Sequence, residues 1–107
     1  MALLDTSAVI LRYKKQESID DDITIVTVIE FPRIMMYKKF TGRVLFPTMD
    51  DYVLAYRLQV KLHKMGNPQS FADLLIAAIT INRNETLVTA DEDFIGIAEA
   101  ANRLEKS

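Results

Sequence analysis

The sequence contains no cysteine and no tryptophan, and only three glycines and three prolines among its 107 residues. The absence of cysteine excludes a disulfide framework and any metal site built on thiolates, and it fits a reducing compartment, so we expect a cytoplasmic protein. With so few glycines and prolines, no flexible linker divides the chain. We therefore expect residues 1–107 to form a single domain, which is long enough to bury a normal hydrophobic core.

Long hydrophobic runs and a strong charge of one sign are also absent. Asp5 interrupts the N-terminal apolar run too early for a signal peptide, and the longest later run, 71–81, is too short to cross a bilayer and contains Asp73. The formal net charge of -2 excludes a protein that coats nucleic acid through a general excess of basic residues. We expect a soluble protein with no membrane segment, in which binding of a polyanion needs a local basic patch or a metal ion.

Short apolar runs predict strands that are buried on both faces of a parallel sheet. They lie at 1–4, 23–26 and 86–89, with a further candidate for a short strand at 43–46. Helical periodicity predicts helices at 8–15, 28–40, 50–65, 71–82 and 94–104. On the helix at 50–65 we expect the core-facing residues to be Tyr52, Val53, Tyr56, Val60 and Met65. Because strands alternate with helices, the sequence predicts an α/β fold: a three-layer α/β/α sandwich with a mostly parallel central sheet.

Acidic residues follow three of the predicted strands. Asp5 follows the first strand, Glu30 follows the second, and Asp91 with Asp93 follows the last. Asp73, at the start of the apolar helix 71–82, can point to the same place. Because the carboxyl ends of parallel strands meet at one edge of a sheet, where ligands bind in such folds, the sequence predicts an acidic cleft there.

Each acid also has a purely structural interpretation. The pairs Thr27/Glu30 and Ser70/Asp73 have the spacing of capping boxes, and Asp5 and Asp91 fit N-caps. Capping does not explain why several acids share one edge with no lysine or arginine inside their motifs. Carboxylates that crowd one concavity without counter-charges repel one another, and this repulsion calls for a cation. A site for Mg²⁺ or Mn²⁺, which prefer oxygen ligands, is the simplest hypothesis.

Four segments resemble the signature blocks of the PIN-domain family. They are LLDTS at 3–7, TVIE at 27–30, FADLLIAA at 71–78 and LVTADEDF at 87–94, and they occur in the order of the family and span nearly the whole chain. The nearest relatives would be the small VapC-like toxins of toxin–antitoxin pairs. The resemblance implies a metal-dependent ribonuclease that hydrolyses RNA phosphodiester bonds, that has a cognate antitoxin as its partner and that forms a homodimer.

The resemblance also assigns roles to individual residues. The catalytic acids would be Asp5, Glu30, Asp73 and Asp91. The ligands of Mg²⁺ or Mn²⁺ would be Asp5, Asp73, Asp91 and Asp93. Hydroxyls that orient carboxylates or water would be those of Thr6, Ser7 and Thr89. Six basic residues are candidates for flanking phosphates, with a merely solvent-facing surface as their alternative: Arg12, Lys14, Lys15, Lys38, Lys39 and Arg43.

The chain departs from the family pattern between Ile10 and Ile23, where relatives have room for an additional or longer helix, and we expect a more open cleft as a result. It also ends soon after the last block, where many relatives return with a further strand. The rival hypothesis is a catalytically silent interaction module of the same fold. Retention of four acids favours the enzyme, because a module that binds only protein has no use for mutually repelling carboxylates, whereas the lack of a basic surface slightly favours the module.

Overall fold

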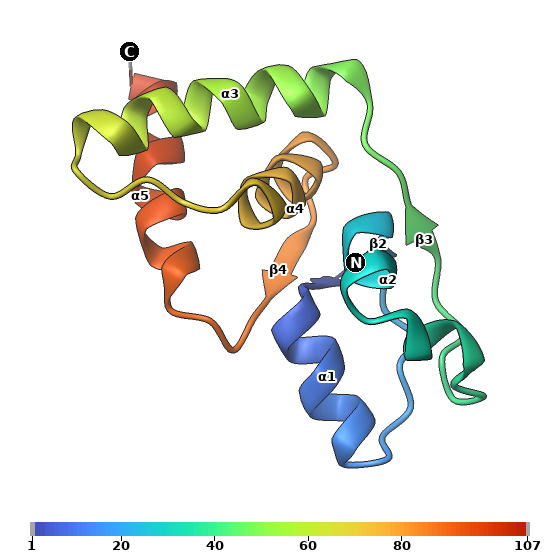
Figure 1. Ribbon diagram of the computed structural model, residues 1–107. Helices are drawn as coiled ribbons and strands as arrows, with labels where there is room; N and C mark the ends of the chain where they lie inside the picture. The colour runs from blue at the N-terminus through green and yellow to red at the C-terminus, as the bar shows by residue number, and fades with distance from the viewer. Residues whose placement is uncertain (1, 107) are drawn as a thin grey trace.

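The computed structural model describes the backbone of residues 2–106 and the side chains of residues 2–101. Figure 1 shows short strands at the centre with helices around them. In chain order the elements are β1 (Ala2–Leu4), α1 (Thr6–Lys14), β2 (Ile23–Thr24), α2 (Ile25–Glu30), the 3₁₀ helix η1 (Pro32–Met36), β3 (Val44–Leu45), α3 (Met49–Lys64), α4 (Phe71–Asn82), β4 (Thr86–Val88) and α5 (Asp93–Lys106). No described helix combines the length and apolar character that are needed to cross a membrane.

The strands form two parallel pairs that are joined through Asp22. Strand β1 pairs with β4, and β2 pairs with β3. A bridge between Leu3 and Asp22 links the pairs: the Asp22 N–H donates to the Ala2 carbonyl, and the Asp22 carbonyl accepts from the Leu4 N–H. The spatial order is therefore β3–β2–β1–β4 with all strands parallel, which confirms the predicted parallel sheet and places every strand's carboxyl end at one edge.

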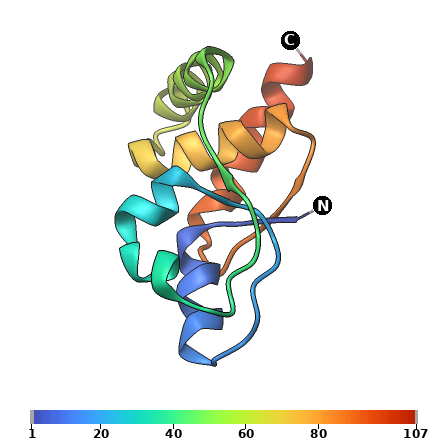
Figure 2. The ribbon, with the colours of Figure 1, turned by 90° about the vertical axis from the view of Figure 1, so that its right-hand side faces the viewer.

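Alternate residues of each strand pack on opposite faces of the sheet. Leu3, Leu45 and Leu87 pack against a core formed largely by α3, α4 and α5. Their sequence neighbours Leu4, Val44 and Val88 pack on the other face with residues of α1 and η1. This is the two-residue periodicity of a β-strand. Figure 2 shows α3, α4 and α5 on one side of the strands and α1 with η1 on the other, which confirms the predicted three layers.

The segment after β2 differs from the prediction of a strand at 23–26 and a helix at 28–40. Thr24 ends the strand and caps α2, because its Oγ1 accepts the Thr27 N–H at 3.3 Å. Thr27 therefore lies inside the helix, and the Thr27/Glu30 capping box is wrong. Pro32 lacks the N–H that would continue the helix, so α2 ends at Glu30 and the 3₁₀ helix follows.

The predicted inward face of α3 is also wrong, because this helix carries two apolar stripes. The exposed stripe contains four of the five residues expected in the core, Tyr52, Val53, Tyr56 and Val60, whereas Met65 packs against the core as predicted. The buried positions of α3 are Asp51, Ala55, Leu58 and Leu62. The branched aliphatic side chains with a small alanine pack closely against the neighbouring helices, whereas two tyrosines keep their hydroxyls in water by staying outside.

Three charged residues, of which only Asp22 is buried, lie together at the amino ends of the strands. Asp22 is 0% exposed, and Arg43 binds its carboxylate through Nε at 3.0 Å and Nη2 at 2.7 Å. This hydrogen bonding keeps the pKa of Asp22 below its ordinary value. Burial, together with a hydrogen bond to Asp22, raises the pKa of Glu85. Arg43, a candidate for phosphate binding, thus lies at the edge of the sheet opposite to Asp5.

The Glu85→Gln variant is expected to be more stable than the parent at pH 7.5, with a smaller difference near pH 4. The folded-state pKa of Glu85 is raised, so its favourable contribution exists below the unfolded-state pKa and is lost as pH rises through the folded-state value. Glutamine stays uncharged at every pH, so the stability that Glu85 loses on ionisation is kept. Its side-chain amide still offers an N–H donor to Asp22. Urea unfolding at both pH values measures the difference, and an equal stabilisation at both would contradict this account of Glu85.

Candidate active site at the carboxyl edge of the sheet

Three carboxylates converge where the strands end. One oxygen from each of Asp73, Asp91 and Asp93 lies within 4.8 Å of the other two, and we call these residues the acidic group. Asp73 is in the first turn of α4, whose N-cap is Ser70, and its N–H donates to Ser70 Oγ at 3.2 Å. The Asp93 N–H donates to Asp91 Oδ1 at 2.9 Å at the start of α5. The acidic edge predicted from the strand ends is therefore observed for these three residues.

The electrostatics of the acidic group are unfavourable without a counter-charge. Partial burial raises the pKa of Asp73, the hydrogen bond with Ser70 lowers it, and the negative charges of Asp91, Asp93 and Glu30 raise it further. The ion pairs Arg12–Asp21, Arg43–Asp22 and Arg83–Asp51 all lie outside the group. The group is thus a concentration of like charge, and a bound cation would relieve the repulsion.

Asp5 lies beside the acidic group and is held by hydrogen bonds. It is 2% exposed, and its Oδ1 accepts from the Ala8 N–H at 2.9 Å, so the N-cap interpretation of Asp5 is confirmed. Ser7 Oγ donates to Oδ1 at 2.8 Å, and Thr89 Oγ1 donates to Oδ2 at 2.5 Å. Since Thr89 Oγ1 also accepts the Asp91 N–H at 2.9 Å, one hydroxyl connects Asp5 to the turn that carries the acidic group. Its predicted role as a metal ligand stays a prediction.

Glu30 is anchored by a threonine of a different helix. Thr6 Oγ1, at the start of α1, donates to Glu30 Oε1 at 2.6 Å. The same Thr6 oxygen lies 3.0 Å from Thr27 Oγ1, and Thr27 is 0% exposed. The sequence interpretation missed Thr27 because it treated this residue as a helix cap. The signal available was its spacing, since positions three apart on a helix share a face and Thr27 therefore lies on the face of Glu30.

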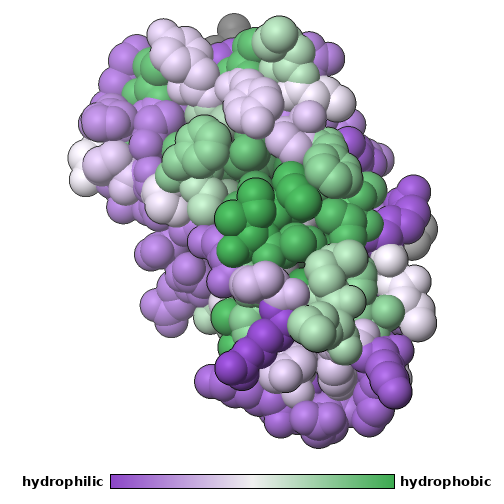
Figure 3. All heavy atoms as spheres, turned by 45° about the vertical axis from the view of Figure 1, so that its right-hand side comes forward, coloured by the Kyte–Doolittle hydropathy of each residue, from purple (hydrophilic) through white to green (hydrophobic). Residues whose placement is uncertain are grey.

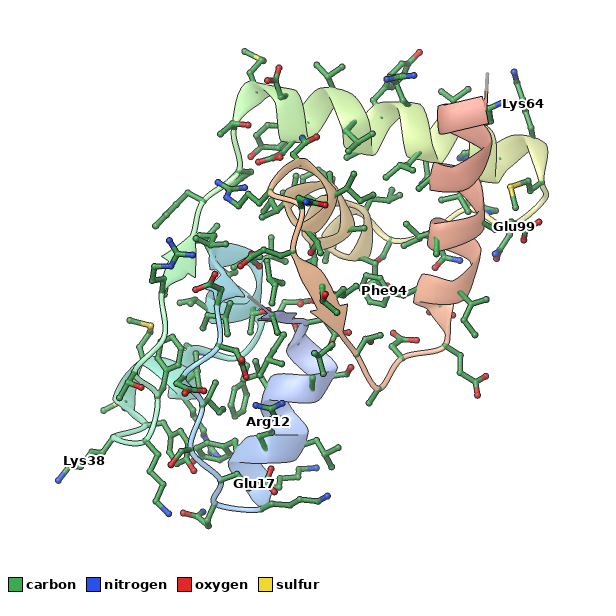
Figure 4. The ribbon with its side chains drawn as sticks, turned by 180° about the vertical axis from the view of Figure 1, so that it is seen from behind. Arg12, Glu17, Lys38, Lys64, Phe94 and Glu99 are labelled. Carbon is green, nitrogen blue, oxygen red and sulfur yellow. The ribbon has the colours of Figure 1, made fainter. Side chains whose placement is uncertain are left out.

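The six candidate phosphate-binding residues are not gathered at the acidic group. Arg12 pairs with Asp21 at 2.6 Å, and Lys39 Nζ donates to the Gln16 carbonyl at 2.8 Å. Arg43 binds Asp22, as described above, and all six residues except the half-buried Arg12 are exposed. Figure 4 shows Lys38 pointing into solvent at the end of the molecule away from α3 and α5. None of these contacts involves the acidic group, and a role in substrate binding stays a prediction.

Comparison with known proteins gives structural relatives only. No family model matches the sequence, and no curated protein matches it. VapBC-1 from nontypeable Haemophilus influenzae contains a chain with a TM-score of 0.71 and 19% identity, with 92% of each chain covered. DNA-bound VapBC from Salmonella typhimurium gives a TM-score of 0.70 at 16% identity and covers 87% of this chain and 89% of that one.

A third similar structure is VapBC2 from Rickettsia felis bound to a DNA fragment from its promoter, with a TM-score of 0.64, 17% identity and coverage of 91% and 93%. At these identities the likeness concerns the fold. The chain therefore has a mixed α/β fold that is found in VapBC complexes, and this supports the VapC-like fold that the sequence motifs predict.

Proposed function

We propose that this protein is a metal-dependent ribonuclease of the PIN-domain type, formed as one domain by residues 1–107 and acting in the cytoplasm as the toxin of a toxin–antitoxin pair. The observation that carries the proposal is the convergence of Asp73, Asp91 and Asp93 at the carboxyl edge of a parallel sheet. Asp5 and Glu30 lie beside this group, so all the acids that the sequence motifs single out belong to one region. The VapC-like fold supports the same function.

The donor set of the acidic group fits Mg²⁺ or Mn²⁺. All three side chains offer carboxylate oxygens, which these hard cations prefer, and Asp73 and Asp91 are only partly buried, so the site leaves room for water ligands. Asp73, Asp91 and Asp93 would hold the ion, with Asp5 as the further ligand that the motifs imply. A bound ion of this kind polarises a phosphoryl oxygen and lowers the pKa of a bound water.

The chain's own residues prepare this site before RNA arrives. Asp5 accepts from Thr89, and Thr89 in turn accepts from the Asp91 N–H, so the turn that carries Asp91 is tied to β1. Thr6 binds the exposed Glu30, whose negative charge lies near enough to raise the pKa of Asp73. Supporting hydrogen bonds of this kind fix the orientation of metal-binding carboxylates. The acidic group repels a phosphate unless a cation is present, which makes metal dependence part of substrate binding.

The proposed macromolecular partners are RNA, a cognate antitoxin and a second copy of the chain. Figure 3 shows apolar side chains gathered on one face of the molecule. Large apolar residues are exposed on α2, α3 and the start of α4: Ile29, Met49, Tyr52, Val53, Tyr56 and Phe71. Exposed apolar patches of this kind mark protein interaction sites. This face supports association with protein partners.

Incubation of the purified protein with structured and unstructured RNAs, in Mg²⁺, Mn²⁺ or EDTA, tests the proposed function. We expect cleavage of at least one RNA in the presence of a divalent ion and none in EDTA. Cleavage that persists unchanged in EDTA would contradict the metal mechanism. A failure to cleave any RNA would favour the catalytically silent interaction module.

A further inference from the structure

The hydroxyls of Thr6 and Thr27 form a hydrogen bond whose direction follows from proton counting. Each hydroxyl has a single proton to donate. Thr6 Oγ1 donates its proton to Glu30 Oε1 at 2.6 Å, because an ionised carboxylate accepts only. In the 3.0 Å contact between the two threonines, Thr6 must therefore accept and Thr27 must donate. The chain of donors runs from Thr27 to Thr6 to Glu30.

Thr27 lies in the first turn of α2, which begins at Ile25, so no residue of its own helix lies four positions earlier to accept its hydroxyl proton. A threonine deeper in a helix commonly donates to the carbonyl four residues earlier. Thr80 of α4 does so, with its Oγ1 2.8 Å from the Ile76 carbonyl. Thr27 is buried like Thr80, yet its hydroxyl contacts α1, and its backbone N–H is bound separately by Thr24. The hydroxyl of Thr27 is thus available to orient Thr6.

We infer that Thr27 is a positioning residue, which fixes the hydroxyl of Thr6 so that Thr6 holds Glu30 toward the acidic group. The inference rests on the proposed function. Glu30 is exposed, and a free glutamate side chain samples many rotamers, so its position depends on this contact. Without the Thr27 donor, the Thr6 hydroxyl is free to rotate away, and Glu30 loses its restraint while the carboxylates of the acidic group stay in place.

Calorimetric titration with Mn²⁺ alone tests the inference. Thr27→Val keeps the branched shape and removes the donor. We expect it to weaken Mn²⁺ binding about tenfold, because Glu30 adds negative charge near Asp73, and this is the lower end of the effect for groups outside the ligand set. Thr27→Ser restores the donor and should restore affinity to within about twofold of the parent. Thr80→Val is the matched control, because it removes a buried threonine hydroxyl from another helix, and it should bind Mn²⁺ as the parent does.

A double variant separates positioning from a general structural effect. In a Glu30→Gln background, Thr27→Val should cause no further loss of Mn²⁺ affinity, since its effect acts through Glu30. An equal loss in both backgrounds, or a Thr27→Val protein that binds Mn²⁺ like the parent, would overturn the inference and leave the proposed function intact. A parent protein that binds no Mn²⁺ would overturn both. Thr27→Ala provides a second donor-free variant if the valine form does not fold.

Discussion

The Asp73→Asn variant is expected to be at least as stable as the parent in EDTA, to gain no stability from Mn²⁺ and to lose ribonuclease activity. As a first-turn residue of α4, Asp73 contributes about 0.3–1 kcal/mol through the helix dipole. Against this, two unit charges about 4 Å apart repel by about 4 kcal/mol at an effective dielectric constant of about 20. Solvent screens much of this repulsion, but the repulsion from Asp91, Asp93 and Glu30 still exceeds the helix-dipole contribution. The raised pKa of Asp73 agrees with this, because it means that the charged form of Asp73 is disfavoured.

Thermal melts of both proteins in EDTA and in Mn²⁺ measure this difference. Asp50→Asn is the matched control, because Asp50 is an exposed acid in the first turn of α3 and lies outside the acidic group. The control should lose about 0.3–1 kcal/mol in EDTA and keep the full gain from Mn²⁺. If Asp73→Asn instead behaves like this control, Asp73 only stabilises the helix and the metal site is misassigned.

The Asp5→Ala variant is expected to be less stable than the parent by about 2–4 kcal/mol in EDTA, which is the opposite of the result for Asp73. Asp5 caps α1 and accepts from the Ala8 N–H, Ser7 and Thr89. Its removal leaves these buried or partly buried donors without a charged acceptor. The variant should also gain less stability from Mn²⁺, because Thr89 no longer ties the turn of Asp91 to β1.

Chemical unfolding of Asp5→Ala and Asp5→Asn tests this role. Asparagine keeps one oxygen for the Ala8 N–H, but its amide nitrogen cannot accept from Thr89, so Asp5→Asn should fall between the parent and Asp5→Ala. An Asp5→Ala protein with parental stability in EDTA would mean that the hydrogen bonds around Asp5 contribute nothing, and that Asp5 does not organise this edge of the sheet.

The layered fold and the acidic edge were predictable because they depend on local patterns. Apolar runs that end in polar residues set β1 and β4, and parallel strands then bring Asp91 and Asp93 to the same edge as Asp5. The start of α4 was predictable from Ser70, which caps the helix as its sequence position indicates. These features depend on periodicity and on turn chemistry, and both can be read from neighbouring residues.

The remaining features depend on tertiary contacts that no local pattern encodes. The prediction of the inward face of α3 was wrong because the helix has two apolar stripes. Packing with α4 and α5 selects the stripe that contains Leu58 and Leu62. The Thr27 hydroxyl bond to Thr6 joins two helices, and the Arg43 pair with Asp22 joins the starts of two strands. Each of these partners is about 20 residues distant in sequence, so a reading of spacing alone could not find it.

A crystal soaked in MnCl₂ tests the central claim most directly, through the anomalous scattering of manganese. The account predicts an anomalous peak at the acidic group, within about 2.0–2.3 Å of carboxylate oxygens of Asp73 and of Asp91 or Asp93. The same soak of an Asp73→Asn crystal should show no peak there. A parent crystal that diffracts well and has no peak at this group, or one with manganese bound only at other acidic residues, would contradict the metal site and the ribonuclease mechanism that depends on it.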